Sequence, residues 1–347
     1  MKFKIGRDGL GKIVALNSAT VMNPHMFIVG TSGSGKSYFL RGMVEQAVTQ
    51  GAHVVVFDAS RDWSQQLNSS GEDLALNGLR VVDVRGMDVS FNPLLPHIRA
   101  DGVMETPSDV GSRVADLLAN AYRLRIDTAV YLDNAITEYL RMTGQQPCSL
   151  AGLVHFMCSE PEIFKRTKAS IARLVNLSNV INCGEYQTDW FFSEPGLTII
   201  DFGGVSNEQQ QALITELIVG EIWEKRLRCN SADVRRPLIL VFDEAQKFRF
   251  GESTNLVRVL REGRKFGLAG WFATQYIDNP LAAKALDLAA FRPVFRPAPR
   301  QVGKIVNLLG CQKQAQKAEL TQKLISLQRG EYLVQDMKGQ IHDLFVE

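Results

Sequence analysis

The sequence lacks any apolar run long enough to cross a membrane. Its longest apolar stretches have the length of a β-strand, far below the ~18 consecutive residues that a membrane-spanning helix needs. Residues 1–7 include basic side chains but neither an apolar core nor a cleavage site of small residues, so they do not resemble a secretion signal. We therefore expect no stable membrane insertion and a cytoplasmic location.

Cysteine and histidine are scarce and scattered. The chain of 347 residues holds five of each, with no Cys-x-x-Cys pair and no histidine at metal-ligand spacing. This distribution predicts reduced, mostly buried thiols and argues against structural zinc. We interpret His25 and His53 as packing residues, and the one metal that we expect is Mg²⁺.

A strong charge of either sign is also missing. The formal net charge is +2, which is too small for a protein that holds nucleic acid over its whole surface. A subunit with so little net charge can still gather Lys and Arg on one face, for example on the inner face of a ring. The sequence therefore predicts that any contact with DNA is local.

The sequence does contain a complete phosphate-binding loop, which lies between an apolar strand at residues 26–29 and a helical stretch that begins near residue 38. Glycines let such a loop curl so that its N–H groups surround phosphates at a helix N-terminus. Lys36 would reach the β- and γ-phosphates and Ser37 would ligate Mg²⁺. The residues predicted to bind the nucleotide are Gly30, Thr31, Ser32, Gly33, Ser34, Gly35, Lys36, Ser37 and Tyr38.

A pair of acids supplies the second part of the expected site. Residues 237–242 are continuously apolar, which is typical of a buried strand in a parallel sheet, and Asp243 and Glu244 follow directly. Carboxylates at this end of a strand face the ligand crevice. Asp243 is expected to hold the Mg²⁺ shell and Glu244 to activate water for attack on the γ-phosphate. Because the chain has no Asn-Lys-x-Asp stretch that would read guanine, we expect ATP hydrolysis.

The order of strand and helix patterns predicts an α/β fold with a mostly parallel sheet flanked by helices. Between residues 101 and 190 the periodicity becomes helical, and we expect an all-helical insertion there. An independent domain on linkers is the alternative, but no Ser/Gly/Pro-rich hinge flanks this segment. The predicted division is 1–100 for an N-terminal strand pair and the first part of the core, 101–190 for the insertion, and 191–347 for the second part of the core with a C-terminal hairpin.

Local signals predict helix ends and buried helix faces. Ser206 with Gln209 forms a capping box for one core helix, and Thr254 is placed to cap the helix that follows the acidic pair. Inside the insertion, periodicity places the following residues on buried faces: Val110, Val114, Leu117, Leu118, Tyr122, Ile136, Tyr139, Leu140, Ile171, Leu174, Val175 and Val180.

Arginines and a glutamine follow the acidic pair. Arg258, Arg261 and Arg264 recur at three-residue spacing, so they share one drifting helix face. A solvated basic face is the ordinary interpretation. The functional alternative is an arginine that reaches the γ-phosphate bound by a neighbouring subunit, which would make hydrolysis depend on assembly. Gln275 ends the next strand, where its amide would sense the γ-phosphate or position water, or simply cap the strand.

The order of these motifs resembles the HerA/FtsK superfamily of hexameric P-loop motors, and within it the HerA-like branch that adjoins the conjugation ATPases. The most specific matches are Asp-Glu-Ala-Gln at residues 243–246, Arg-Glu-Gly-Arg-Lys at 261–265 and Ala-Thr-Gln at 273–275. Together with the phosphate loop and the stretches 56–58, 91–94 and 196–201, they cover nearly the entire chain.

The resemblance implies a RecA-like P-loop ATPase core that assembles as a homohexamer and moves double-stranded DNA, often beside a nuclease or another effector protein. It implies that channel loops near residues 247–249 touch the DNA backbone. An ATPase for protein or DNA transfer in a conjugation or secretion machine stays open as an alternative, as does a nucleotide-gated scaffold for an effector nuclease. By resemblance the site roles fall on Lys36 and Ser37 for phosphate and Mg²⁺, Asp243 and Glu244 for metal and water, Gln275 for sensing, and Arg261 or Arg264 for the subunit interface.

Overall fold

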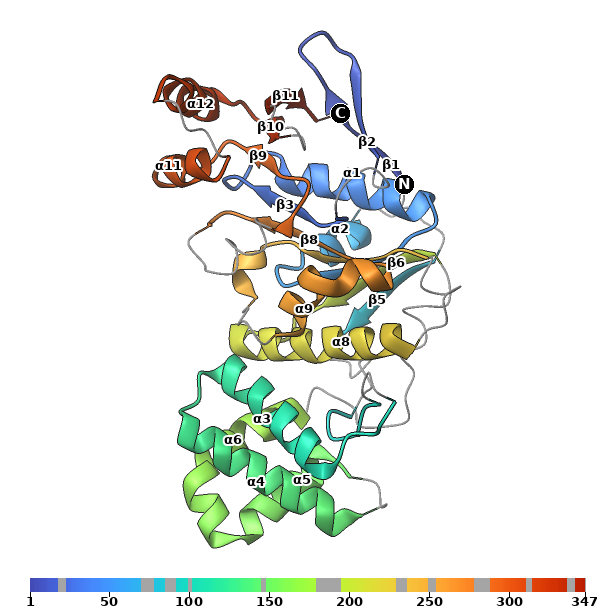
Figure 1. Cartoon of the computed structure of the whole chain (residues 1–347), viewed down its shortest axis with the longest axis vertical. Coiled ribbons are helices and arrows are strands. Elements are labelled where there is room, and N and C mark those ends of the chain that lie inside the picture. Colours follow the sequence, from blue (N-terminus) through green and yellow to red (C-terminus); the bar gives the residue numbers. More distant parts are fainter. Residues whose placement is uncertain are drawn as a thin grey trace.

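The computed structural model describes residues 1–17, 23–69, 78–84, 92–98, 102–144, 148–178, 195–228, 236–248, 254–277, 288–309, 314–335 and 341–346. These residues form an 11-stranded sheet with helices on both faces (Figure 1). The α/β class and the mostly parallel sheet are therefore as predicted. Within the described residues, no helix combines the length and the apolar composition needed to span a bilayer.

The strands follow the order β2-β1-β11-β10-β9-β3-β8-β7-β4-β6-β5 across the sheet. From β9 to β5 all neighbours are parallel, whereas β2, β1, β11 and β10 join through antiparallel pairs. The strands are β1 (Lys2–Arg7), β2 (Ile13–Asn17), β3 (Met26–Val29), β4 (His53–Asp58), β5 (Leu79–Asp83), β6 (Gly196–Asp201), β7 (Leu238–Phe242), β8 (Leu268–Thr274), β9 (Pro293–Phe295), β10 (Glu331–Gln335) and β11 (Ile341–Phe345).

Both faces of the central sheet are buried, which explains why its strands are apolar throughout. On β4, Val54 and Val56 belong to one hydrophobic cluster, while Val55 and Phe57 belong to the cluster on the other face. The first face packs against α1 (Lys36–Thr49) and α2 (Asp62–Ser69). The second packs against α8 (Glu208–Arg228), α9 (Asn255–Glu262), α11 (Pro299–Leu308) and α12 (Gln314–Ser326), and short 3₁₀ turns η2 (Ala245–Lys247) and η3 (Gly263–Phe266) flank α9.

The described residues between β5 and β6 form a helical bundle that lies beyond α8, away from the sheet (Figure 1). Most residues predicted for its buried faces are buried, including Val114 and Leu174, but Val175 is 37% exposed and that prediction is wrong. Val180 lies outside the described residues. The boundaries of the insertion stay a prediction. Its helices are α3 (Pro107–Tyr122), α4 (Ile126–Thr143), α5 (Leu150–Ser159) and α6 (Pro161–Ser178).

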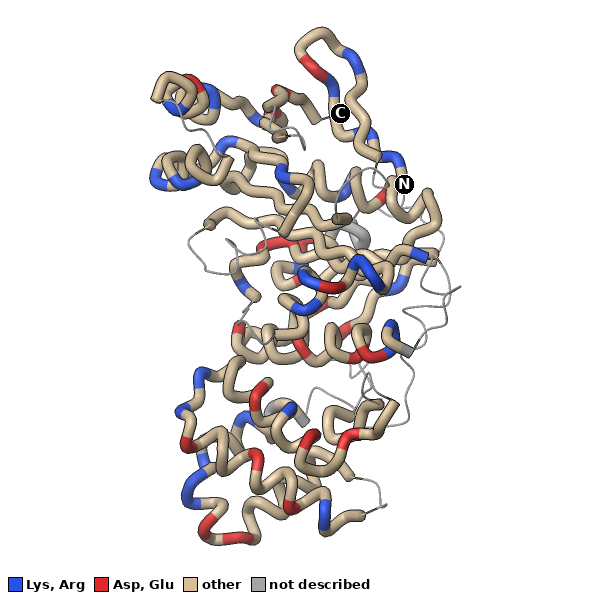
Figure 2. Tube along the Cα trace, in the orientation of Figure 1, with Lys and Arg blue, Asp and Glu red and all other residues tan. Residues whose placement is uncertain are grey.

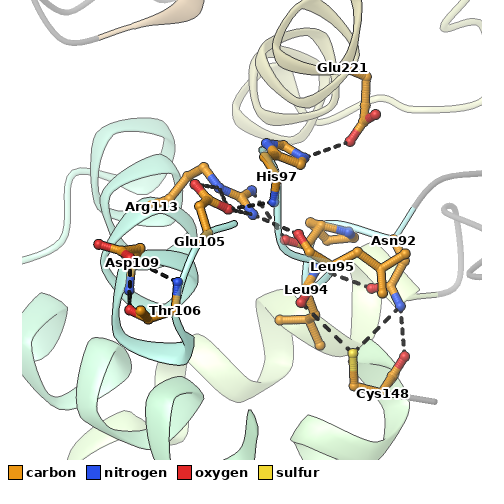
Figure 3. Close-up of polar contacts among 11 residues, drawn as sticks. Asn92, Leu94, Leu95, His97, Glu105, Thr106, Asp109, Arg113, Cys148 and Glu221 are labelled. Atoms are coloured by element: carbon orange, nitrogen blue, oxygen red, sulfur yellow. Dashed lines mark hydrogen bonds and ion pairs between the residues drawn. The ribbon is translucent and has the colours of Figure 1, made fainter. Parts of the chain in front are cut away.

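A polar junction ties the bundle to the core (Figure 3). The Arg113 guanidinium donates to the Glu105 carboxylate and, through Nη2, to the Leu95 carbonyl, each at 2.9 Å. Burial alone would raise the pKa of Glu105, but the hydrogen bonds from Arg113 and from the His97 amide hold it below its ordinary value. The His97 ring contacts Glu221 of α8 at 3.2 Å. This junction therefore links the residues before the bundle, the bundle itself and the core.

The Asn-Pro-Leu residues at 92–94, which belong to the matching stretch 91–94, are part of the same junction. The Asn92 amide donates to the Cys148 carbonyl at 2.7 Å, and its carbonyl oxygen accepts from the Leu94 amide at 3.1 Å. Asn92 is 4% exposed. In this structure the motif holds the start of α5 against the segment that enters the bundle.

Two predicted caps have different outcomes. Thr254 is the N-cap of α9, and its hydroxyl accepts from the Val257 amide as expected. The predicted capping box of Ser206 with Gln209 is wrong. The Asn207 carboxamide oxygen accepts from the Gln209 amide at 2.9 Å, and α8 begins at Glu208, directly after Asn207. Asn is as good an N-cap as Ser. The sequence therefore did not distinguish Ser206 from Asn207 as the residue that caps α8.

Candidate nucleotide site

The phosphate loop links the C-terminal end of β3 to the N-terminus of α1. Gly35 has a φ of 112°, a left-handed conformation that side chains other than glycine rarely adopt. A Cβ at Gly30 would lie 2.7 Å from the Cβ of Phe295, so the loop also needs glycine where it crosses β9. The backbone at these positions is therefore shaped for close approach, and the N–H groups of the first turn of α1 are available for phosphates.

Lys36 is buried at the start of α1, with 7% of its surface exposed. Its ammonium donates to the Thr31 carbonyl at 2.7 Å, which folds the side chain back over the loop. Burial lowers the pKa of Lys36, and the negative charges of Asp243 and Glu244 oppose that shift. The ammonium is thus held over the phosphate loop, near both acids of the predicted site.

Asp243 and Glu244 follow β7, which lies two strands from β3 across the sheet. Burial raises the pKa of Asp243, while hydrogen bonds from Trp63 and Ser37 oppose the rise. Glu244 adopts a left-handed backbone conformation with φ 57°. Its carboxylate forms an ion pair with the Lys247 ammonium, three residues later in η2.

Gln275 directly follows β8, which pairs in parallel with both β3 and β7. The strand that ends before Gln275 therefore lies beside the strand that leads to the acidic pair. The Thr274 hydroxyl donates to the Gln246 carboxamide oxygen at 2.9 Å, so the end of β8 is linked to η2. This bond holds the segment before Gln275 against the segment after Glu244.

One cleft of about 570 Å³ brings most of the predicted site together. Its lining combines the phosphate loop and α1, the acidic pair and Gln275. Gly30, Thr31 and Ser34 shape the loop without lining the cleft. The predicted residues that line it are Ser32, Gly33, Gly35, Lys36, Ser37, Tyr38, Asp243, Glu244 and Gln275.

Several lining residues were not identified by sequence reasoning. Asp62 comes from α2, and Gln246 lies within the Asp-Glu-Ala-Gln motif, which was a signal that could have pointed to it. Arg329 and Gly330 come from the turn before β10, where the Gly330 amide donates to the Ser34 carbonyl at 3.0 Å. No local pattern marks that turn as part of a nucleotide site.

The arginines of the predicted subunit interface do not line this cleft. Arg258 places its guanidinium 5.0 Å from the centre of the Trp223 ring, which commits it to packing on α8. Arg261 and Arg264 are exposed. The seven residues of β8, at about 3.3 Å each, separate Arg264 from the cleft edge of the sheet. Of the predicted channel segment 247–249, Lys247 pairs with Glu244 and residue 249 lies outside the described residues.

The donor chemistry of the cleft fits a nucleotide with Mg²⁺. A glycine-shaped loop, a buried ammonium, the Ser37 hydroxyl and the buried Asp243 carboxylate are the groups that phosphates and a hard cation require. Within the described residues no cluster of three or more His, Cys, Asp or Glu side chains offers a dedicated metal cage. His25 and His53 are buried and hydrogen-bonded, to the Gly270 amide and the Thr198 hydroxyl respectively, which agrees with their interpretation as packing residues.

Comparison with known proteins places this geometry among related folds. Residues 5–144 match the family described as the central domain of the helicase HerA. Over 274 residues the chain is 24% identical to the DNA import protein CedB of Sulfolobus acidocaldarius, a match that takes in 77% of this chain and 43% of CedB. The chain thus spans less than half the length of that curated relative.

Two solved structures share the fold. VirB4 of Thermoanaerobacter pseudethanolicus is 17% identical, with a TM-score of 0.76 over 99% of this chain and 96% of that one. The bacterial conjugative coupling protein TrwB is 15% identical, with a TM-score of 0.64 over 93% of this chain and 85% of that one. TrwB has also been solved with ADP and Mg²⁺. The likenesses confirm the predicted RecA-like P-loop ATPase fold.

Proposed function

We propose that this chain, which is similar to the P-loop ATPases of the HerA/FtsK type, hydrolyses ATP with Mg²⁺ and uses the reaction to move double-stranded DNA through a ring of identical subunits. The observation that carries the proposal is the single cleft lined by the phosphate loop, both acids and Gln275. The name of CedB, a DNA import protein, supports DNA as the transported polymer. The complex of TrwB with ADP and Mg²⁺ supports the nucleotide and the metal.

The cleft supports a division of roles among its own residues. Lys36 holds the β- and γ-phosphates, and Ser37 with Asp243 holds Mg²⁺, which neutralises charge on the phosphates when bound. Glu244 orients a water and accepts its proton, since it is the less buried acid and lies beside Asp243 at the cleft. Gln275 positions that water or senses the γ-phosphate through its amide.

The ring is part of the proposal because Arg261 and Arg264 do not line the cleft of their own chain. Arg261 and Arg264 are exposed. They lie in α9 and η3, just before β8 begins, whereas Gln275 follows the other end of β8 at the cleft. We therefore infer that one of them completes the site of a neighbouring subunit. Such an arginine contributes about 10³- to 10⁵-fold to turnover in other phosphoryl-transfer enzymes.

The surface charge suits a local contact with DNA. Lys and Arg segments alternate with Asp and Glu segments over both the core and the helical bundle (Figure 2). With the two signs intermixed in this way, contact with the sugar-phosphate backbone would be limited to a few places, and such backbone contacts suit a motor that moves along any sequence. An effector nuclease is also proposed as a partner, on the basis of the resemblance alone.

The test is steady-state ATP hydrolysis by size-fractionated protein, with and without long double-stranded DNA, using Glu244→Gln as the blank. Strong stimulation by DNA in the oligomeric fraction, which weakens as salt rises, supports the DNA motor. Hydrolysis that ignores DNA would contradict it and redirect the function toward protein transfer or a nucleotide-gated scaffold.

A further inference from the structure

Trp63 occupies a position next to the nucleotide site that no sequence motif indicated. It is the second residue of α2, and its backbone is fixed by Asp58 at the end of β4. One oxygen of that carboxylate accepts from the Trp63 amide at 3.1 Å and from the Ser64 amide at 2.9 Å. Asp58 has no exposed surface. The start of α2 is therefore held rigidly against the sheet.

The indole ring of Trp63 is just as constrained. It is 1% exposed and belongs to the hydrophobic cluster on the α1 face of the sheet. The Arg41 guanidinium of α1 lies 5.3 Å from the ring centre, and the same group donates to the Asp62 carbonyl at 3.2 Å. The ring is thus held between the phosphate-loop helix and α2.

This placement directs the indole N–H at the acid that is expected to hold Mg²⁺. Nε1 of Trp63 donates to Oδ2 of Asp243 at 3.2 Å. The other oxygen, Oδ1, accepts from the Glu244 amide at 3.1 Å. Because each oxygen has a donor on a different element, the plane of the carboxylate is fixed.

We propose that Trp63 is a positioning residue for the Mg²⁺-nucleotide, whose indole N–H holds the Asp243 carboxylate in its metal-binding orientation. The inference rests on the proposed ATPase function. Mg²⁺ demands near-ideal octahedral geometry, and donors behind a metal-binding carboxylate usually account for about 10- to 100-fold in metal affinity. The Trp63 N–H is neutral, so it orients the carboxylate and leaves its negative charge in place.

The test compares Trp63→Phe with Trp223→Phe. Both substitutions keep an aromatic ring and remove an indole N–H from a side chain that is 1% exposed. The N–H of Trp223 has no hydrogen-bond partner in the described part of the chain, so its loss reports packing alone. Binding of a fluorescent ATP analogue is followed by anisotropy while Mg²⁺ is titrated, and thermal melting checks that each variant is folded.

The Mg²⁺ midpoint is the concentration of Mg²⁺ that gives half of the Mg²⁺-dependent gain in affinity for the analogue. We expect this midpoint to be about 10- to 100-fold higher in Trp63→Phe than in the original protein. Its affinity for the analogue in EDTA should equal that of the original protein, and Trp223→Phe should behave like the original protein in both measurements. An unchanged Mg²⁺ midpoint for Trp63→Phe, or an equal shift in both variants, overturns the proposal.

If Trp63→Phe does not fold, benzothienylalanine in place of Trp63 keeps the bicyclic shape and removes only the N–H, and the same shift is expected. The experiment separates two failures. If Mg²⁺ does not tighten analogue binding in the original protein, the proposed function itself fails. If it does, and the changes at Trp63 leave the midpoint in place, only the role of Trp63 is wrong.

Discussion

The ammonium of Lys247 forms an ion pair with the carboxylate of Glu244, the residue that we propose as the general base. Both side chains are about a quarter exposed, at 29% and 26%. Glu244 also adopts a left-handed backbone conformation, which costs a residue other than glycine roughly 1–2 kcal/mol. The acid is therefore held in one place by a partner that would compete with water for its oxygens.

Replacement of Lys247 should therefore raise ATP hydrolysis in the absence of DNA. We expect Lys247→Met to increase the basal rate severalfold, because Glu244 is then free to accept a proton from water. The rate is measured without DNA, against Lys12→Met as the control, since Lys12 is exposed in the loop between β1 and β2. A basal rate that stays the same or falls would show that the ion pair does not restrain Glu244.

Lys36 and Glu244 should fail in different ways. Lys36→Ala removes the ammonium that lies over the phosphate loop and should abolish ATP binding. Glu244→Gln should bind ATP normally and lose about 10²- to 10⁴-fold in kcat, since the amide cannot accept the proton. Equilibrium binding and single-turnover hydrolysis measure the two steps separately. Equal loss of binding in both variants would contradict the assigned roles.

The arginine that acts between subunits can be identified by mixing variants. Arg261→Ala and Arg264→Ala are each assayed alone and then mixed with Glu244→Gln. The variant that removes the acting arginine should be inactive alone and regain part of the activity in the mixture, because an intact cleft then receives an arginine from its neighbour. If neither mixture regains activity, the arginine acts within its own chain or not at all.

Stability should depend on pH through Glu216 in α8. This carboxyl is fully buried, and burial raises its pKa to about 7 even though it accepts from the Asn255 and Leu256 amides at the start of α9. The folded state therefore binds more protons than the unfolded state between pH 4.5 and about 7. Its contribution to stability is complete below that window and is lost as the pH rises through it, with a slope of at most about 1.4 kcal/mol per pH unit.

Glu216→Gln isolates this contribution because every other titrating group is common to both proteins. Urea unfolding at a series of pH values gives the difference in unfolding free energy between the two. We expect the original protein to lose stability relative to Glu216→Gln as the pH rises through this window. A constant difference would mean that Glu216 titrates normally in the folded state.

The sequence predicted that several residues of the cleft lie together because they belong to local motifs on parallel strands. The phosphate loop, Asp243 and Gln275 each follow an apolar strand, and the C-terminal ends of parallel strands share one edge of a sheet. That rule was enough to bring them into one cleft without knowledge of strand order. Periodicity likewise predicted most of the buried positions of the bundle, but it failed at Val175, which is exposed.

The remaining parts of the cleft depend on contacts between distant segments. Trp63 reaches Asp243 across 180 residues, and no spacing rule relates an indole to that acid. The contact between Gly330 and Ser34 of the phosphate loop likewise joins segments that are far apart in the sequence, and no spacing rule predicts it. The sequence predicted a strand pair at one end and a hairpin at the other, but nothing in either pattern indicated that β1 pairs with β11.

That pairing of β1 with β11 imposes an order on how the protein matures. The first strands are joined to the sheet by hydrogen bonds to a hairpin that the ribosome makes more than three hundred residues later. The turn before that hairpin also supplies the Gly330 amide that supports the phosphate loop. Pairings between segments so distant in sequence form late, because the chain between them must first be closed into a loop. A nascent chain would thus expose an unfinished cleft until the hairpin has been synthesised, so the ability to bind ATP would be acquired only after that point.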